Sequence, residues 1–511
     1  MPSFSTRCAT ERPGEIALRD GRNAFSWTQI DDKLNRVANA LYAADLGPNR
    51  RIAVFSENGA EVVLAHIGGL IAGCSTVPVN FHLTAEEAAY ILEDSQTRVL
   101  FVGPENARAG VEAARQAGVP RVVGWRCEGI AGVEPFDAFL AASSPAPCRE
   151  DHAPRPNLLY TSGTTGRPKG TELPPTMFAA GATIAEHVER LAQSPFAKAG
   201  GPHLIVGPLY HTGPLSGSRS IAGGTALVIL GRFDAEAVLR AVHDHKCVST
   251  VMVPTHFVRL LQLPEAVKAK YELSALKIIT HTGAKCPVDV KRRMIEWFGP
   301  VLLDAYGATE VGTTCSINSV DWLRFPGSVG KPVPPFEALI VDEEGKQLAP
   351  NTEGRLYFRD TTGRGVVYHN DPEKSKAAHL RPGVFTLGEV GYVNEEGFVF
   401  ITDRFSDMVV SGGANLYPAE AEQVLINHPE IVDIACIGIP HAEMGEEMIG
   451  LAILQPGSAV TGAQLVAWCR ERLSHYKCPK RIELVSDLGR TAAVKINKKR
   501  LREPYWKNAK A

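Results

Sequence analysis

The sequence predicts an α/β protein with a large N-terminal domain and a small C-terminal domain. Segments with helical spacing of apolar residues alternate with short apolar runs over roughly the first 280 residues, a pattern typical of helices layered on a sheet. From residue 333 the pattern changes to hairpin-like alternation, and after residue 404 helices and strands are mixed again. With 511 residues, 44% of them hydrophobic, the chain is long enough for more than one domain.

The predicted elements of the N-terminal part follow one another with proline and glycine between them. Each helix is a segment whose apolar residues recur at helical spacing, and each strand is a short apolar run. The helices are expected at residues 30–44, 60–72 and 235–245, and the strands at 51–55, 99–102, 204–206, 227–230, 248–253 and 276–280. This alternation is the pattern of α/β layers.

A β-rich lobe is expected to close the N-terminal domain, and an α+β unit is expected to follow it. In the lobe, strands at 338–342 and 354–358 form a hairpin, and a further strand lies at 397–402. In the C-terminal unit we expect a turn at 411–413, helices at 418–427 and 462–473, and strands at 431–438 and 449–454.

The composition excludes several classes of protein. The 54 Lys and Arg residues nearly balance the 56 Asp and Glu residues, so no global field favours nucleic acid, and the basic run 495–502 is too local to change this. Ten cysteines without a Cys-x-x-Cys pair or a metal-ligand spacing indicate reduced thiols. No signal segment is evident, and the apolar stretch 62–74 is too short to span a bilayer. We therefore expect a cytoplasmic protein whose membrane contact is at most peripheral.

The segment from Tyr160 to Gly170 reads Tyr-Thr-Ser-Gly-Thr-Thr-Gly-Arg-Pro-Lys-Gly and predicts a phosphate-binding loop. Its glycines permit tight turns in which backbone N–H groups converge on an anion, and its hydroxyls and one ammonium add donors. We expect ATP-like polyphosphate binding by Thr161, Ser162, Gly163, Thr164, Thr165, Gly166 and Lys169. The spacing is not that of a Walker loop, and no helix obviously begins at Lys169. The alternative is an ordinary surface turn rich in Gly, Ser and Thr.

This loop resembles the signature motif of the adenylate-forming enzymes, and further motifs of that family occur along nearly the whole chain. That family includes acyl-CoA synthetases, firefly-type luciferases and the adenylation domains of peptide synthetases, and the fatty-acid and aryl-acid CoA ligases are the most similar. The motifs are Phe25-Ser26-Trp27-Thr28, Pro208-Leu209-Tyr210-His211, Tyr306-Gly307-Ala308-Thr309-Glu310, Asp403-Arg404, Ser411-Gly412-Gly413, Tyr417-Pro418-Ala419-Glu420, and Arg490-Thr491 before Lys495. The resemblance implies an N-terminal domain of residues 1–404, which binds ATP and the acid, and a mobile C-terminal lid domain of residues 405–511.

The resemblance implies a reaction in two halves that uses ATP, Mg²⁺ and CoA. A carboxylate attacks the α-phosphorus of ATP to give an acyl adenylate and pyrophosphate, and the thiol of CoA then displaces AMP. Thr309 would contact the α-phosphate, Glu310 would ligate Mg²⁺, and Tyr306 would stack on adenine. The rest of the expected adenine site is Gly283, Ala284, Gly307 and Ala308.

Lys495 is the expected catalytic residue of the first half-reaction, because its ammonium can bridge the carboxylate and the α-phosphate oxygens. The sequence from Arg490 to Arg502 resembles the family pattern, except that Val494 replaces the usual glycine. A lysine in a basic run is more often part of a solvated face, which is the alternative interpretation.

Two further sets of residues follow from the resemblance. Glu389 and Arg404 are expected to bind the ribose, although relatives carry an aspartate where Glu389 stands. Ser406 occupies the position of the family's Asp or Lys hinge, which leaves the pivot uncertain. For the second half-reaction, the thiol arm of CoA is expected to pass along Ser411, Gly412 and Gly413.

The acyl pocket is expected near Tyr210 and His211, which look like the family's gate, and His211 is also a candidate catalytic residue near the carboxylate. Other expected pocket residues are Gly213, Gly283 and Lys285. Several glycines suggest a roomy pocket, hence a fatty, aromatic or steroid-like acid. Two alternatives stay open: an enzyme that loads a carrier protein instead of CoA, and a non-catalytic relative that binds an adenylate. A homodimer also stays open.

Overall fold

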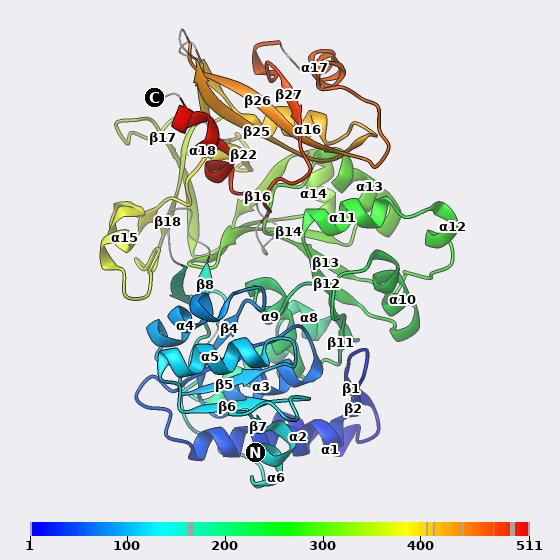
Figure 1. Ribbon diagram of the computed structural model, residues 1–511, viewed down its shortest axis with the longest axis vertical. Coiled ribbons are helices and arrows are strands. Elements are labelled where there is room, and N and C mark those ends of the chain that lie inside the picture. Colours follow the sequence, from blue (N-terminus) through cyan, green and yellow to red (C-terminus); the bar gives the residue numbers. More distant parts are fainter. Residues whose placement is uncertain are drawn as a thin grey trace. The chain divides into compact units, whose positions relative to one another are not determined.

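The computed structural model describes residues 3–161, 168–178, 180–404, 407–411, 414–441, 444–473, 475–490 and 496–508. The chain divides into two compact units, each of which contains both strands and helices (Figure 1). The first unit comprises residues 1–283, 294–313 and 366–375, and the second comprises residues 284–293, 314–365 and 376–511. The hairpin-rich segment thus falls in the unit that contains the C-terminus, and the boundary at residues 404 and 405 stays a prediction.

A parallel sheet occupies the N-terminal part of the first unit. Its strand order is β4 (Ser75–Val79), β3 (Arg51–Phe55), β5 (Val99–Val102), β6 (Arg121–Gly124) and β7 (Glu134–Pro135). Every residue of β3, β4 and β5 is buried, as expected for strands that are covered on both faces. The helices that connect these strands are α3 (Ala60–Ile71), α4 (Ala85–Asp94) and α5 (Ala107–Ala117).

Helix α2 (Trp27–Ala43) packs on α3 in the same unit. It begins before the predicted residue 30, because Ser26 and Gln29 form a capping box that satisfies the first backbone N–H groups. The two helices approach closely at Gly68, where a Cβ atom would lie 2.4 Å from Cγ1 of Val37. Helix α3 is buried at every position. No helix in the described ranges is both long and apolar enough to cross a membrane.

A second group of neighbouring strands in the first unit carries most of the predicted site segments. Its strand order is β2 (Ala24–Ser26), β1 (Ile16–Arg19), β11 (Leu227–Ile229), β10 (His203–Ile205), β12 (Ser249–Met252), β13 (Ile278–His281) and β14 (Leu302–Ala308). The strands are parallel except β2. Helices α9 (Thr212–Ser218), α10 (Ala235–His245) and α11 (Pro254–Leu261) and the 3₁₀ helix η1 (Arg219–Gly223) lie between strands. In open α/β sheets, ligands bind beyond the carboxyl ends of the strands.

The predicted phosphate loop joins two antiparallel strands, β8 (Leu158–Thr161) and β9 (Lys169–Glu172). Lys169 pairs with Thr161 at the mouth of this hairpin, so the chain continues from Lys169 as a strand, which agrees with the exclusion of a Walker loop. Segment 366–375 docks on β9, because Thr171 donates its hydroxyl to the carbonyl of Val367 over 2.9 Å and His369 N–H donates to the carbonyl of Gly170 over 2.8 Å.

The second unit contains two groups of strands. In the first group, β17 (Phe336–Val341) and β18 (Gly354–Asp360) form the predicted hairpin, and β21 (Glu389–Val393) pairs with β22 (Val399–Arg404). In the second group, β25 (Ile431–His441) pairs with β26 (Gly445–Leu454), which also pairs with β23 (Val409–Ser411) and β27 (Ile482–Leu484). Of these pairs, only β26 with β27 is parallel. The flanking helices are α16 (Pro418–Leu425), α17 (Gly462–Arg470) and α18 (Lys498–Asn508). The predicted helices and strands of this region are therefore confirmed, with ends that differ by a few residues.

We predict that Ile67→Ala destabilises the first unit by about 2–5 kcal/mol, because the side chain on α3 is 1% exposed and its removal leaves a cavity. The measurement is the denaturant dependence of unfolding. The control is Val320→Ala in helix α14 (Ser319–Arg324), where the side chain is 61% exposed and the expected change is within about 0.5 kcal/mol. Equal effects of the two substitutions would contradict this assignment of the core.

Candidate active site

The turn after β14 places the residues of the Tyr-Gly-Ala-Thr-Glu motif. A Cβ atom on Gly307 would lie 1.9 Å from the carbonyl oxygen of Gly312, so only glycine fits at this position. On the neighbouring strand, Gly283 has a φ of +87°, which glycine adopts without strain. The Thr282 hydroxyl donates to the carbonyl of Ala305 over 2.7 Å and ties the end of β13 to β14. These contacts fix the backbone from which Thr309 and Glu310 follow.

Thr309 lies against the start of helix α9. Its hydroxyl is 2.9 Å from the hydroxyl of Thr212, the first residue of α9. His211 precedes that helix, and its ring is tilted against the ring of Tyr210 with the centroids 4.3 Å apart. Burial raises the pKa of Tyr210 to about 12, so its hydroxyl is neutral near pH 7. The structure therefore brings the predicted gate residues next to the predicted phosphate contact Thr309.

Glu310 lies in a cluster of charged and aromatic groups. The hydroxyl of Tyr368 hydrogen-bonds to the Glu310 carboxylate, and burial followed by this carboxylate raises the pKa of the tyrosine. The ammonium groups of Lys169 and Lys374 lie 5.8 Å and 5.7 Å from the centre of the Tyr368 ring. The cluster thus joins the predicted metal ligand to the predicted phosphate-binding lysine. Tyr368 and Lys374 were not predicted, because no local motif links residues 368–374 to the loop some 200 positions earlier.

A buried histidine–aspartate contact lies on β13 and β14, just before the expected adenine residues, and was also missed. His281 on β13 is opposite Asp304 on β14, with 3.4 Å between Nε2 and Oδ2, and the His281 side chain is fully buried. Because side chains alternate along a strand, Asp304 lies on the same face of β14 as Tyr306. The signal in the sequence was a histidine and an aspartate at equivalent ends of two consecutive strands.

Gly213 lies where α9 crosses β12. A Cβ atom there would be 3.0 Å from Cγ1 of Val251, so the glycine permits close packing of the helix on the strand. This close packing by itself explains why residue 213 is a glycine. The place of Gly213 in an acyl pocket stays a prediction.

In the second unit, Glu389 and Arg404 are directly opposite each other on β21 and β22. The Glu389 side chain is 8% exposed, and Gly388 before it has a φ of +93°.

Lys285 donates its ammonium to the carbonyl of Ile401 over 2.9 Å, and Ala284 precedes it on the surface. Lys285 therefore has a partner within the protein, and its contact with an acid stays a prediction.

Ser411 ends β23 and is buried there. Ten further residues named in the sequence analysis lie outside the described ranges. They are Ser162, Gly163, Thr164, Thr165, Gly166, Gly412, Gly413 and Lys495, together with Ser406 and Val494. Ala308 ends β14, and its place in the adenine site stays a prediction.

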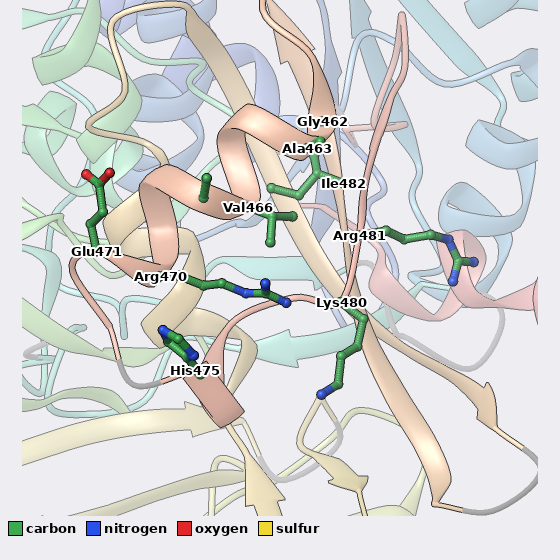
Figure 2. A pocket seen from close by; sticks show the side chains of 10 residues that line it. Gly462, Ala463, Val466, Arg470, Glu471, His475, Lys480, Arg481 and Ile482 are labelled. Atoms are coloured by element: carbon green, nitrogen blue, oxygen red, sulfur yellow. The ribbon is translucent and has the colours of Figure 1, made fainter.

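A pocket of about 620 Å³ lies beside helix α17 in the second unit (Figure 2). Its apolar wall includes Val466 and Ile482, and Arg470, Lys480 and Arg481 line it with cationic side chains, together with His475. The Arg481 guanidinium points away from the other cations and forms ion pairs with Glu447 and Glu483. No sequence motif predicted this pocket.

We predict that Gly307→Ala destabilises the first unit by about 1–3 kcal/mol, because the new methyl group overlaps the carbonyl of Gly312. Thermal unfolding measures the change. Gly231→Ala is the control, since no heavy atom lies within 4 Å of a Cβ atom at that position. If both variants unfold at the same temperature, the close approach is absent in solution.

Comparisons with known proteins agree with this architecture. The AMP-binding enzyme family model matches residues 5–366, and the model of the AMP-binding enzyme C-terminal domain matches residues 420–495. A 3-[(3aS,4S,7aS)-7a-methyl-1,5-dioxo-octahydro-1H-inden-4-yl]propanoyl:CoA ligase of Rhodococcus jostii is 31% identical, with 98% of each chain covered. A fatty acid–[acyl-carrier-protein] ligase of Streptomyces coeruleorubidus is 30% identical over 96% of this chain and 93% of its own.

The solved structure of ATP-bound MatB from Rhodopseudomonas palustris has a TM-score of 0.80 with 26% identity and covers 99% of both chains. The family match spans well over half of the chain and the relatives span nearly all of it. The chain therefore belongs to the AMP-binding enzyme family, and by class it is an AMP-forming acyl-CoA synthetase.

Proposed function

We propose that this enzyme activates a fatty, aromatic or steroid-like carboxylic acid with ATP and passes the acyl group to CoA. The proposal rests on two sets of contacts in the first unit. Thr309 contacts Thr212, which follows the gate residues Tyr210 and His211. Glu310 and Lys169 both lie near Tyr368. A hydroxyl, a carboxylate and an ammonium are the groups that polyphosphate chemistry needs in fixed positions. The substrate class is supported by relatives whose names specify a bulky bicyclic acid and a fatty acid.

In the first half-reaction, a carboxylate oxygen of the acid attacks the α-phosphorus of ATP, and the bond to the β-phosphate oxygen breaks. Thr309, held by Thr212, donates a hydrogen bond to an α-phosphate oxygen. Lys495 neutralises the charge that the carboxylate and the α-phosphate share in the transition state, and His211 orients the carboxylate. The loop residues from Thr161 to Gly166 and Lys169 hold the departing pyrophosphate.

The residues around Glu310 fit a Mg²⁺ ion that is bound mainly through the substrate. No group of three or more His, Cys, Asp or Glu in the described part of the chain could hold a metal ion. One carboxylate with phosphate oxygens and water is the ligand set that Mg²⁺ accepts in nucleotide enzymes. The ion would supply charge neutralisation to the phosphates, and Tyr368 holds the Glu310 carboxylate in place through its hydrogen bond.

Other residues bind the nucleotide and the thiol. Tyr306, Gly307, Ala308, Gly283 and Ala284 form the adenine site, and Glu389 and Arg404 bind the ribose hydroxyls. In the second half-reaction, the sulfur of CoA attacks the acyl carbonyl and the bond to the AMP oxygen breaks, with Ser411, Gly412 and Gly413 beside the thiol arm. All ten cysteines are buried and none of them forms a disulfide, which supports a reducing compartment such as the cytoplasm. A homodimer and peripheral membrane contact stay predictions.

The second candidate acceptor is the phosphopantetheine of a carrier protein. It is favoured by the relative that is named for an acyl-carrier-protein as acceptor. Relatives named as CoA ligases at similar identity and coverage favour CoA.

We predict that pyrophosphate release depends on ATP, Mg²⁺ and one class in a panel of fatty, aryl and steroid carboxylic acids, and that an acyl-CoA forms when CoA is present. Mass spectrometry identifies the product, and chelation of Mg²⁺ should abolish the release. Accumulation of acyl adenylate that CoA leaves unchanged would contradict CoA as the acceptor.

We predict that Lys495→Ala lowers the rate of acid-dependent pyrophosphate release by about 10²-fold or more, because an electrostatic contact to the transition state is lost. The matched control is Lys499→Ala, an exposed residue of the same basic run, which should retain the wild-type rate. Comparable losses in the two variants would indicate a general effect of the basic run instead of catalysis by Lys495.

A further inference from the structure

Asp94, the last residue of helix α4, contacts two segments that are far from it in the sequence. Its carboxylate accepts a hydrogen bond from the hydroxyl of Tyr160 over 2.6 Å and one from the side-chain amide of Asn370 over 3.2 Å. Tyr160 lies on β8, directly before the residue from which the predicted phosphate loop starts. Asn370 belongs to segment 366–375, which also carries Tyr368. One carboxylate therefore joins the root of the loop to this segment.

The contact between Asp94 and Tyr160 is a charge-assisted hydrogen bond, a type that is shorter and stronger than a bond between neutral groups. Burial, followed by the Asp94 carboxylate, raises the pKa of Tyr160. The hydroxyl therefore stays protonated near pH 7 and donates to the carboxylate. The root of the loop is thus held by a strong contact from α4.

Arg51 makes a second connection between the same elements. Its Nη1 donates to the carbonyl of Ser95, the residue after Asp94, over 3.1 Å and lies 3.2 Å from Nε2 of His369. Its Nη2 pairs with the carboxylate of Glu172 on β9 over 3.2 Å. Because a guanidinium only donates, Nε2 of His369 is the acceptor and the ring is neutral. Segment 366–375 is therefore held at two adjacent residues, His369 and Asn370.

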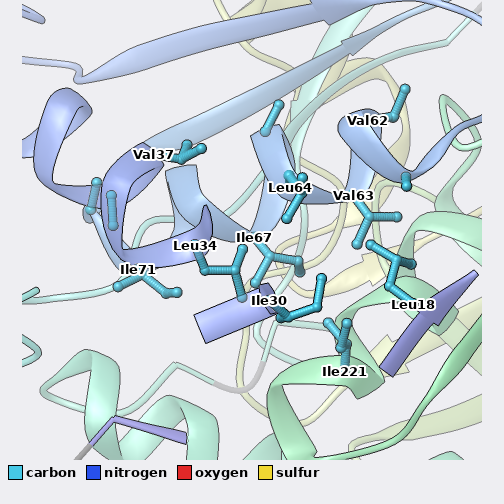
Figure 3. Close-up of a cluster of buried hydrophobic side chains, with 14 of the residues drawn as sticks. Leu18, Ile30, Leu34, Val37, Val62, Val63, Leu64, Ile67, Ile71 and Ile221 are labelled. Carbon is cyan, nitrogen blue, oxygen red and sulfur yellow. The ribbon is translucent and has the colours of Figure 1, made fainter. Parts of the chain in front are cut away.

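The elements that carry Asp94 and Arg51 are packed in the core of the first unit. Arg51 begins β3, and the next residue, Ile52, is fully buried in the core cluster that includes Ile67 of α3 (Figure 3). In α4, Leu92 is 1% exposed and packs in a second buried cluster. The core therefore fixes the positions from which these two side chains extend.

Segment 366–375 connects the predicted metal ligand to the predicted phosphate loop. The hydroxyl of Tyr368 hydrogen-bonds to the Glu310 carboxylate, and the ammonium of Lys169 lies 5.8 Å from the centre of the Tyr368 ring. The N–H of His369 donates to the carbonyl of Gly170 over 2.8 Å. A shift of the segment along β9 would therefore move Tyr368 relative to both Glu310 and Lys169.

We propose that Asp94 is a positioning residue for the binding of the ATP triphosphate. It holds segment 366–375 against the root of the loop, so Glu310 and Lys169 have their separation before the nucleotide binds. Without this contact, part of the binding free energy offsets the ordering of the segment. The inference rests on the proposed function, because it takes the loop and Glu310 to hold the triphosphate and its metal ion.

The first test measures the binding of MgATP to the full-length enzyme by calorimetry, without acid or CoA. We expect Asp94→Ala to weaken binding roughly 5- to 20-fold, because two hydrogen bonds to a charged acceptor are lost. Removal of a carboxylate near the predicted loop would by itself favour an anionic ligand, so the sign of the change separates positioning from charge. The control is Glu93→Ala, which removes an exposed carboxylate from the neighbouring position of α4 and should not weaken binding.

A double substitution exchanges the acceptor and the donor. In Asp94→Asn with Asn370→Asp, the amide at position 94 can donate to the carboxylate at position 370, and its oxygen can accept from Tyr160. Residue 370 has a φ of +54°, a left-handed conformation that asparagine and aspartate both adopt more readily than most residues. We expect the double variant to bind MgATP within about threefold of the wild type. Unchanged affinity in Asp94→Ala, or an equal loss in the double variant, would overturn the proposal.

The second test is amide hydrogen exchange without nucleotide, which does not depend on the reaction and needs no change at Asp94. We expect peptides that cover residues 366–375 to exchange faster in Asn370→Ala, an exposed position, than in the wild type. Equal exchange in the two proteins would overturn the proposal. A wild type that binds no MgATP would overturn the proposed function as well, whereas a wild type that binds MgATP no better than Asp94→Ala would overturn only the positioning by Asp94.

Discussion

The close approach of Gly307 to the carbonyl oxygen of Gly312 is the constraint on which the candidate active site depends. Because no side chain fits between them, the chain leaves β14 in a tight turn with one conformation. That turn aims Thr309 at the first residue of α9 and Glu310 at Tyr368. Thr176 supports the turn from outside, since its hydroxyl donates to the carbonyl of Val311 over 2.8 Å. The groups proposed to act on the phosphates thus lie at the end of a strand, where their positions can be precise.

Two sets of polar and charged side chains lie near this turn. The carboxylates of Glu310 and Asp371 act on Tyr368, and the ammonium groups of Lys169 and Lys374 lie near its ring, so two negative and two positive side chains meet at this tyrosine. The His281–Asp304 contact lies two residues before Tyr306 on the same face of β14, with 3.4 Å between Nε2 and Oδ2.

The sequence predicted the elements of both units well, because each is a local pattern. The strand at 51–55 and the helix at 235–245 have the predicted ends, since apolar spacing and flanking glycine or aspartate specify them within a few residues. Motif residues such as Thr309 and Glu310 were identified through resemblance. Contacts between distant segments were missed, and Tyr368 is the main example. Its partner Glu310 and its neighbour Lys169 lie 58 and 199 positions away, a separation at which periodicity carries no information.

The central claim is that the geometry around Thr309 and Glu310 supports formation of an acyl adenylate. The most direct measurement is the exchange of labelled pyrophosphate into ATP in the absence of CoA, because this reports reversal of the first half-reaction alone. We expect exchange that requires both Mg²⁺ and a carboxylic acid. Exchange that proceeds without any acid, or no exchange with any acid of the fatty, aromatic and steroid-like classes, would contradict it.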